Sequence, residues 1–438
     1  LNPEPLHAFI DAFMIGEWDE CFPEVLAVYR RYQREYKAHR VSREEILREL
    51  ACLEGVYVPG LYDVRYDERG SLAEFTPRYA GLGTVVKKRY VRDLNRAPFP
   101  VSWLVPYVQI VHDRISLEVM RGCPNRCRFC QGRVQYHPLR LRSAENLMGL
   151  ARRAHEKTGY EEITLCGLSV SDYPGLERLV KEMVDYFQQK AVAVSFPSIK
   201  ANSTLVSDMF ETVARIKKPG LTFAPEAGTA RLRKILAKNF DEDVFMAALT
   251  RAYQAGYQRV KLYYMIGLPG ERDEDIDGII ALTERVACLR REAVPGKPQA
   301  HVNVSVNTFI PKPHTAFQWF GMDSRQAVER KRERLRRRLQ GKKTTVHVAA
   351  YETSFIEGVL SRGDRRLSRV ILRAYTLGAR FDGWEDHFSL ERWLRAFQDE
   401  GIDPHAYIAG RPCGSRLPWD FIDTGMDKQK LREEFRSI

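Results

Sequence analysis

The sequence lacks long apolar runs, and it has few cysteines. No stretch of its 438 residues comes close to the ~20 apolar residues of a membrane-spanning helix, so we expect no contact with a membrane. The chain has 8 cysteines and no secretory signal, and it is large enough to fold without disulfide bonds. It is therefore not a disulfide-bonded secreted domain. Internal repeats, low-complexity segments and a targeting peptide are also absent, and the sequence therefore favours a cytoplasmic location.

Acidic residues are fewer than basic ones. The chain has 69 Lys and Arg against 57 Asp and Glu, which gives a formal net charge of +12. A basic excess favours acidic partners such as nucleic acid, but it does not bear on the fold. Hydrophobic residues make up 44% of the chain, which is enough for a sizeable core, and the length predicts about two to three domains.

Three of the cysteines are clustered. Cys123, Cys127 and Cys130 have three and then two residues between them. Three thiolates this close in sequence can converge on one metal centre, and they are one fewer than a four-iron cluster usually takes, which leaves one iron open for chemistry. A structural zinc site would need a fourth ligand, for which His137 is the nearest candidate, and chance clustering is a third interpretation. The remaining cysteines are Cys21, Cys52, Cys166, Cys288 and Cys413.

This spacing, with Phe129 just before the last cysteine, resembles the signature of the radical S-adenosylmethionine (radical SAM) enzymes. The resemblance implies that Cys123, Cys127 and Cys130 hold a [4Fe-4S] cluster, whose fourth iron chelates the amino and carboxylate groups of SAM, and that Phe129 borders the cofactor. It also implies reductive cleavage of SAM to a 5′-deoxyadenosyl radical, which abstracts hydrogen from a substrate. A reductant such as flavodoxin or ferredoxin would supply the electron.

Short β-branched or aromatic runs alternate with amphipathic stretches in the middle of the chain. Strands this apolar on both faces suit a parallel sheet that is covered by helices. The resemblance implies an α/β fold with a partial (βα)6 TIM-like barrel, whose active site lies at the C-terminal ends of the strands. The expected strands are 115–120, 163–166, 192–196, 221–224, 260–266 and 302–309.

The ends of the second and third expected strands carry candidate SAM contacts. Gly167 would let the backbone approach the methionine moiety, and Ser169 offers a hydroxyl. Ser195 and Ser198 could meet the ribose or the carboxylate of SAM. An ordinary turn and a capped loop explain these residues about equally well.

The fourth expected strand ends in a sharper motif. Glu226 lies in the segment Pro-Glu-Ala-Gly, which resembles the Pro-Glu-x-Gly segment of methylthiotransferases, coproporphyrinogen-oxidase-like proteins and Elongator-type enzymes, where it lies beside SAM. A carboxylate suits ribose hydroxyls or an ammonium. Arg231, one turn into the next helix, suits the SAM carboxylate, and a merely exposed arginine is the alternative.

The last two strand ends complete the candidate site. Ile266 ends the fifth strand and Gly267 follows it, in a segment that the family uses to sandwich adenine. The segment after the sixth strand resembles that of methylthiotransferases and B12-linked radical SAM proteins, and it offers Lys312 and His314 as substrate contacts.

The flanks suggest further parts. The whole chain resembles bacterial radical SAM proteins with an N-terminal B12-binding domain, so cobalamin in the full-length protein and methyl transfer are further expectations. Methylthiotransferases are more distant, because the chain lacks the second cysteine triad that they carry. The expected division is 1–20 as the tail of a truncated Rossmann-like, cobalamin-binding-like domain, 21–110 as a connector, 111–322 as the barrel, and 323–438 as a basic helix with an α-rich subdomain.

A basic run over 330–343 follows the last expected strand. We expect it near the barrel mouth, where its guanidiniums could track the phosphates of an RNA substrate, although a solvated basic face is the alternative. The substrate is otherwise unknown. A competing function is a non-catalytic, zinc-containing RNA-binding protein.

Overall fold

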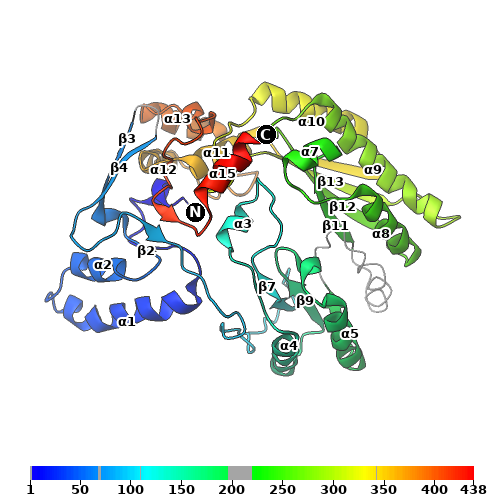
Figure 1. Cartoon of the computed structure of the whole chain (residues 1–438), viewed down its shortest axis with the longest axis horizontal. Coiled ribbons are helices and arrows are strands. Elements are labelled where there is room, and N and C mark those ends of the chain that lie inside the picture. The colour runs from blue at the N-terminus through cyan, green and yellow to red at the C-terminus, as the bar shows by residue number, and fades with distance from the viewer. Residues whose placement is uncertain (1, 68–70, 109, 196–219, 342) are drawn as a thin grey trace.

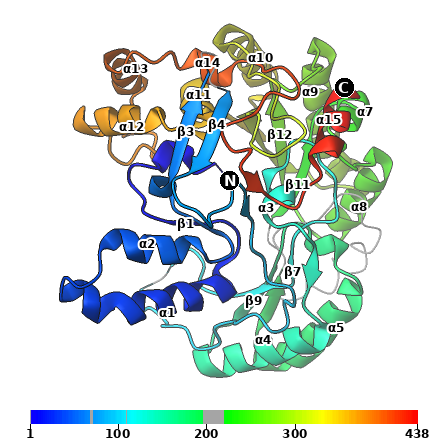
Figure 2. The same cartoon turned by 60° about the vertical axis from the view of Figure 1, so that its left-hand side comes forward.

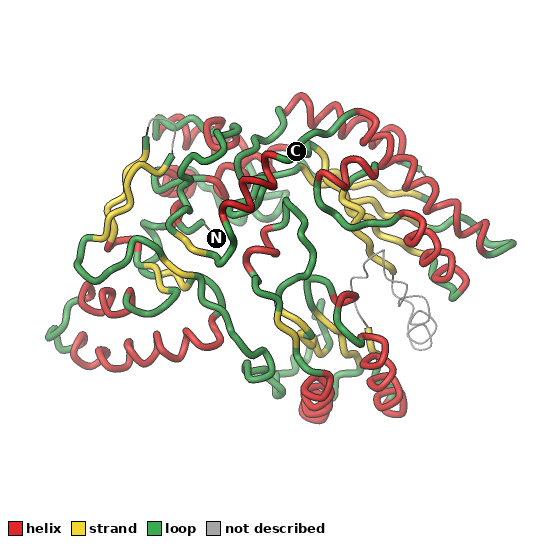
Figure 3. The backbone as a smooth tube through the Cα atoms, viewed as in Figure 1, coloured by secondary structure: helices red, strands yellow, loops and turns green. Residues whose placement is uncertain are grey.

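The computed structural model describes residues 2–67, 71–108, 110–195, 220–341 and 343–438. Two parallel sheets flank a central segment that consists mostly of loops and one short helix (Figure 1; Figure 3). Ser198 and the last residue of the expected strand 192–196 lie outside the described residues.

Each sheet is parallel throughout. The first has the strand order β10-β9-β6, and the second has the order β11-β12-β13-β14. Within the described ranges no strand pair closes the two sheets into a complete barrel, and the expected α/β partial barrel is confirmed. The strands are β6 (Ile115–Glu118), β9 (Glu162–Cys166), β10 (Ala193–Ser195), β11 (Leu221–Glu226), β12 (Arg259–Ile266), β13 (His301–Thr308) and β14 (Thr344–Val348).

Helices cover the outer faces of both sheets (Figure 1). Apolar residues of α4 and α5 pack on the first sheet, and those of α8, α9 and α10 pack on the second. The helices between strands are α4 (Ala144–Thr158), α5 (Leu176–Phe187), α7 (Ala230–Ile235), α8 (Glu242–Gln254), α9 (Asp273–Ala293) and α10 (Arg325–Leu339).

The alternation along β12 explains which side chains face the helices. Leu262, Tyr264 and Ile266 are buried in the cluster that also contains the apolar side of α9. The residues between them, Tyr263 and Met265, point to the opposite face, because successive side chains of a strand alternate. The inner face of the barrel is therefore lined by this second set.

The second sheet continues past residue 322, where we expected the barrel to end. β14 pairs in parallel with β13, with Val302 opposite Thr344 and Val306 opposite Val348. The basic helix α10 is the crossover between these two strands and packs Val328, Leu335 and Leu339 against the sheet. The basic helix thus belongs to the sheet layer and not to a separate subdomain.

This connection corrects the expected position of the basic run. A crossover helix runs antiparallel to the strands that it joins, so the C-terminal end of α10 lies by the N-terminal ends of the strands. Consistent with this, the Lys343 ammonium lies 3.3 Å from Nε2 of His301, the first residue of β13. Arg337 and Arg338 therefore lie by the edge of the sheet opposite to the active-site edge.

The N-terminal part packs beside the barrel and is visible on the left of Figure 2. Its core contains Tyr57, Phe75 and Phe421, and the ring centroids of the last two are 4.4 Å apart. Near the start of the chain the structure has one helical turn and the short strand β1, within the 1–20 segment. The elements are η1 (Glu4–Leu6), β1 (Phe13–Met14), α1 (Trp18–Lys37), α2 (Arg43–Ala51), β2 (Val56–Tyr57), η2 (Pro59–Leu61), β3 (Tyr62–Tyr66), β4 (Leu72–Pro77) and β5 (Val86–Lys87).

Helices predominate after β14, and one short strand, β15, pairs in parallel with β5 of the N-terminal part. Glu4 of η1 is fully buried and accepts hydrogen bonds from Tyr57 Oη (2.6 Å), Tyr66 Oη (2.7 Å) and Arg365 Nε (2.9 Å). None of the helices in the described ranges is long and apolar enough to cross a membrane. The elements are α11 (Tyr351–Arg362), α12 (Leu367–Thr376), α13 (Leu390–Asp399), α14 (His405–Ile408), β15 (Ile422–Asp423) and α15 (Lys428–Arg436).

Candidate active site

The segment with the three clustered cysteines starts from β7 (Met120–Arg121) and ends at β8 (Arg140–Leu141), and the short helix α3 (Gln131–Gln135) lies between. Gly122 has a φ of +102°, and a Cβ there would lie 2.7 Å from Leu139 Cα and 2.8 Å from the Tyr136 carbonyl oxygen. Only glycine fits so close to the returning chain. The turn into Cys123 is therefore fixed by backbone packing.

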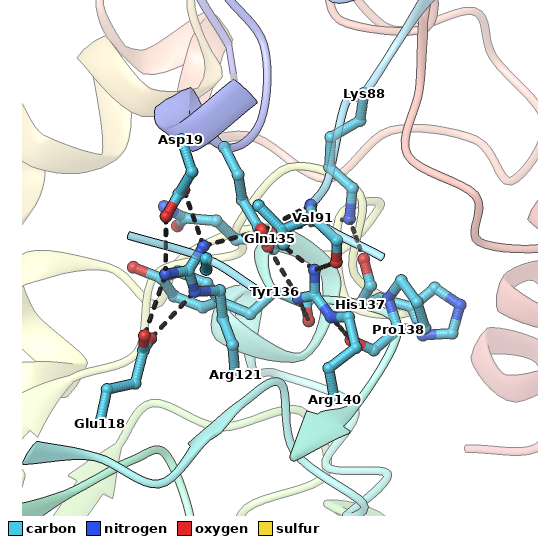
Figure 4. A network of polar contacts seen from close by, with 12 residues as sticks. Asp19, Lys88, Val91, Glu118, Arg121, Gln135, Tyr136, His137, Pro138 and Arg140 are labelled. Atoms are coloured by element: carbon cyan, nitrogen blue, oxygen red, sulfur yellow. Dashed lines mark hydrogen bonds and ion pairs between the residues drawn. The ribbon is translucent and has the colours of Figure 1, made fainter. Parts of the chain in front are cut away.

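Two arginines tie the ends of this segment to the N-terminal part (Figure 4). Arg121, whose side chain is 14% exposed, donates to Glu17, Asp19 and Glu118, each at 2.9 Å. Arg140 donates to the same Glu17 carboxylate at 2.7 Å. Glu17 itself is buried, so both arginines meet one shielded carboxylate and hold the two ends of the segment together.

Lys88 from the end of β5 holds the middle of the segment (Figure 4). Its buried ammonium donates to the carbonyl oxygens of Val134 (2.7 Å), His137 (2.7 Å) and Gln135 (3.3 Å), at the end of α3. Burial lowers the pKa of Lys88 to about 8. The cation binds carbonyl oxygens at the C-terminal end of a helix, where positive charge is favourable.

The three cysteines line a cavity of about 320 Å³ between the two sheets. Each is partly exposed, which leaves its sulfur accessible to a ligand. Burial raises the pKa of the Cys127 thiol to about 11, with Cys130, Glu226 and Cys123 adding to the effect and Lys238 opposing it. A thiolate in this position needs a positive partner such as an iron ion, so the donor set fits a thiolate-held cluster.

The geometry does not favour the zinc interpretation. His137 is not among the residues that line the cavity, and its ring lies near Gly425 instead. Within the described ranges, no three His, Cys, Asp or Glu side chains come together closely enough to hold a single metal ion. His137, the nearest candidate for the fourth ligand of a structural zinc site, thus lies away from the three cysteines.

A polar group lies on the first-sheet side of the cavity. Asn125 Nδ2 donates to Cys123 Sγ (3.4 Å), Ser169 Oγ (3.3 Å) and Asp172 Oδ2 (2.8 Å). Ser169 also donates to Asp172 at 2.6 Å. The predicted Ser169 therefore lines the cavity, as do Asn125 and Ser171, which the sequence analysis did not identify.

Glu226 lines the cavity from the second-sheet side. It has a φ of +69°, in the left-handed region that non-glycine residues rarely adopt, and this follows a bulge that separates Phe223 and Glu226 in the pairing of β11 with β12. Its carboxylate accepts from Lys238 Nζ at 3.4 Å, and burial raises the pKa of Glu226. The strained backbone turns this carboxylate into the cavity beside the cysteines.

Arg231, in contrast, does not reach the cavity. Its guanidinium donates to the Gly270 carbonyl at 3.0 Å and pairs with Asp275 of α9. Lys238, seven residues further along, lines the cavity instead. The role of Arg231 at the SAM carboxylate stays a prediction, and in this structure Asp275 of α9 holds the guanidinium away from the cavity.

Ile266 and Gly267 also lie away from the cavity. Ile266 is fully buried on the helix-facing side of β12. Gly267 has a φ of +78°, its amide donates to Glu271 Oε2 at 2.8 Å, and a Cβ there would lie 3.3 Å from Asp323. The glycine is explained by its turn, and Tyr263 and Met265 are the residues of this strand that face inward.

The two remaining predicted residues support the site without lining it. A Cβ on Gly167 would lie 2.8 Å from Met120 Cγ, so this glycine permits close packing under the cysteine segment. Ser195 Oγ lies 2.8 Å from Thr164 Oγ1 and donates to Glu162 Oε1 at 2.9 Å. The Ser195 hydroxyl thus hydrogen-bonds to residues of the first sheet and not to groups in the cavity.

A second cavity of about 580 Å³ adjoins the first. Phe129, Cys130, Glu226 and Tyr263 line both. The predicted substrate contact Lys312 lines the second cavity, whereas His314 is buried near Trp419, with ring centroids 6.4 Å apart. Aromatic walls such as Tyr263, and Phe240 in the first cavity, were not identified from the sequence, because each lies far from the cysteines along the chain.

Comparisons with known proteins agree with this geometry. A family model described as the radical SAM superfamily matches residues 117–283, and one described as radical SAM proteins, N-terminal, matches residues 1–59. The uncharacterized protein MJ0966 of Methanocaldococcus jannaschii is 31% identical over 320 residues, which is 72% of this chain and 67% of that protein. The tRNA-2-methylthio-N(6)-dimethylallyladenosine synthase of Jannaschia sp. is 28% identical over 205 residues, so the chain spans only 42% of that relative.

Solved structures give weaker likenesses. TsrM, a radical S-adenosylmethionine methyltransferase from Kitasatospora setae, has a TM-score of 0.42 and 13% identity, over 70% of this chain and 53% of that chain. The cobalamin-dependent S-adenosylmethionine radical enzyme OxsB has a TM-score of 0.44 and 11% identity, over 100% of this chain and 69% of that chain. At these scores the likeness bears on neither function nor cofactor. The family models, the long match to the archaeal relative and the three cysteines at the inner edge of a partial barrel agree, and the chain belongs to the radical SAM superfamily.

Proposed function

We propose that Cys123, Cys127 and Cys130 hold a [4Fe-4S] cluster and that SAM binds beside it in the same cavity. The observation that carries this proposal is that all three cysteines line one cavity with Glu226 and Lys238. When bound, the reduced cluster and SAM supply a carbon-centred radical that abstracts a hydrogen atom from the substrate. Membership of an enzyme superfamily overturns the alternative of a non-catalytic zinc-containing RNA-binding protein.

The residues of the chain would bind, orient and shield the cofactor. Lys238 suits the SAM carboxylate, because among the described residues that line this cavity it is the one with a cationic side chain. Glu226 suits ribose hydroxyls or the SAM ammonium. Phe129, Phe240 and Tyr263 offer apolar walls that exclude water from the reacting groups.

The partners follow from the same chemistry. A small reductant such as flavodoxin or ferredoxin would deliver the electron in the cytoplasm. Cobalamin and methyl transfer stay predictions, as does the assignment of residues 1–20 to the tail of a cobalamin-binding-like domain. RNA is a candidate substrate because several matched relatives are named as tRNA methylthiotransferases, although this chain spans less than half of each of those relatives.

Anaerobic reconstitution tests the cluster. Replacing Cys123, Cys127 or Cys130 with alanine should abolish a brown, oxygen-sensitive chromophore and the binding of iron and sulfide. Cys52→Ala and Cys288→Ala are matched controls and should retain both. A triple variant that still assembles the same cluster would show that the ligand assignment is wrong.

The SAM site is tested separately. With dithionite and SAM, the reconstituted protein should release 5′-deoxyadenosine without added substrate. Lys238→Ala should weaken SAM binding about tenfold, the effect of losing one hydrogen bond to a charged group. Arg231→Ala removes a cation that is paired with Asp275 and should leave SAM affinity unchanged. Equal losses in the two variants would contradict the placement of the SAM carboxylate beside Lys238.

A further inference from the structure

Three cavities lined by described residues adjoin one another in a series. The second cavity shares Lys312, Ala349, Thr353 and Glu357 with a third cavity of about 740 Å³. The second cavity in turn shares Cys130 with the cavity of the three cysteines. The volumes of all three cavities lie within the roughly 300–1,000 Å³ that ligand sites occupy. The series therefore extends from the cysteines to the C-terminal helices that line the third cavity.

The third cavity, which we call the outer cavity, is largely apolar. Its apolar side chains come from η1, from α11 and α12, and from α13 with the loop before it. They are Pro5, Leu6, Ile356, Leu360, Ile371, Phe388 and Trp393. Helix faces from four elements converge here without filling the space, which suits an apolar or aromatic portion of a ligand.

The passage between the second and outer cavities carries a charged pair. Lys312 and Glu357 line both cavities and form an ion pair. Their side chains are 25% and 60% exposed, so the pair can open to bind a polar group without leaving a buried charge unpaired. A ligand that extends through the passage would place a polar group here.

The charges around this route disfavour a polyanion. Asp382 and Glu385 also line the outer cavity, so with Glu357 its carboxylates outnumber the single ammonium of Lys312. The basic side chains that suggested RNA do not line the outer cavity. On α10, Lys331 pairs with Glu271 and Arg334 pairs with Asp277.

We propose that the outer cavity binds the apolar portion of the substrate and that this substrate is an amphipathic organic molecule, not RNA. Its polar group meets Lys312 and Glu357, and its reacting carbon lies in the second cavity, beside Cys130 and Glu226. The proposal rests on the proposed function, because a substrate in these cavities can react only if a radical forms at the cysteine cavity. It assigns the outer cavity to the substrate and leaves the inner one to SAM.

Binding of N-phenyl-1-naphthylamine, an uncharged fluorescent aromatic amine, tests the outer cavity in the cluster-loaded protein. Its fluorescence should rise on binding. Leu6→Asp should weaken that binding about tenfold, because a carboxylate replaces apolar contact at the cavity wall. Leu6 is already 43% exposed, so the variant should fold. Phe9→Asp is the matched control, since Phe9 is 44% exposed on the same segment and does not line the cavity.

Competition distinguishes the two classes of substrate. 1-Decanol should displace the probe, and a 20-nucleotide single-stranded RNA should not. The proposal is overturned if the probe does not bind, if Leu6→Asp binds it as tightly as Phe9→Asp, or if the RNA displaces it. Release of 5′-deoxyadenosine without substrate should be the same in both variants, so a failed outer cavity is distinguishable from a failed SAM site.

Discussion

Lys88 should make the stability of this protein depend on pH in a defined direction. The folded protein holds the pKa of Lys88 at about 8, against an ordinary value of 10.5, because the ammonium is buried. Between these two pH values the unfolded chain binds a proton at Lys88 that the folded protein has released. Stability must therefore rise with pH through this window, because the cost of burying the charge is present in full below pH 8 and is relieved above it.

The magnitude follows from the same two values. One pKa unit corresponds to about 1.4 kcal/mol, so the separation from 10.5 to about 8 corresponds to about 3 kcal/mol. Lys88→Met removes the titrating group. The free energy of unfolding of the wild type, measured relative to this variant, should rise by about 3 kcal/mol between pH 8 and pH 10.5.

Urea unfolding of the cluster-free protein, followed by tryptophan fluorescence at several pH values in this window, measures the difference. Lys87→Met, at the exposed neighbouring lysine, is the matched control for effects of pH on the rest of the protein. The reasoning about Lys88 is refuted if both variants follow the wild type in parallel across the window. It is equally refuted if the wild type loses stability relative to Lys88→Met as the pH rises.

Two further substitutions test how the parts of the molecule are joined. Glu4→Gln should lower the free energy of unfolding by about 3 kcal/mol, because it removes the buried charge that pairs with Arg365. Urea unfolding measures this free energy. Glu44→Gln, at an exposed ion pair, is the control and should change the free energy of unfolding far less. Gly228→Ala should strongly destabilise the protein, because the new Cβ would lie 2.1 Å from the Asp275 carbonyl oxygen of α9. Gly149→Ala in α4 is the control, since a Cβ there has no atom within 4 Å and should stabilise the helix by about 1 kcal/mol. Thermal unfolding measures both variants, and equal melting temperatures would contradict the close packing of Gly228 on α9.

The cysteine site could be predicted from the sequence because its determinants are local. Cys123, Cys127 and Cys130 lie within one short segment, and their spacing alone brings them to one cavity. The parallel sheets could be predicted for a similar reason. Each strand is a short apolar run, and apolar runs that alternate with amphipathic helices leave few other folds.

The rest of the site depends on contacts between distant segments. The sequence does not reveal that Arg231 forms an ion pair with Asp275. Nor does it reveal that Lys238 lines the cavity of the three cysteines. A one-residue difference decides whether a side chain on β12 faces the helices, as Ile266 does, or the cavity, as Tyr263 does. Such choices follow from register and packing, which are properties of the folded chain.

The basic helix shows how composition can mislead. Its many arginines suggested a surface for phosphates, but the helix packs one side on a sheet, and Arg334 pairs with Asp273 and Asp277 of α9. Only the pairing of β14 with β13 shows that the helix is a crossover. The sequence contained that strand, but its partner could not be read from local patterns.

The pairing of β5 with β15 has a consequence for synthesis of the chain. The apolar cluster of the N-terminal part contains Phe421 and Ile422, and the backbone amide of Val86 donates to the Phe421 carbonyl at 2.9 Å. A ribosome must therefore release almost the whole of this sequence before its first hundred residues can complete their core. Until then Tyr57 and Phe75 lack their contacts with the Phe421 ring, and this part of their apolar surface stays exposed on the nascent chain.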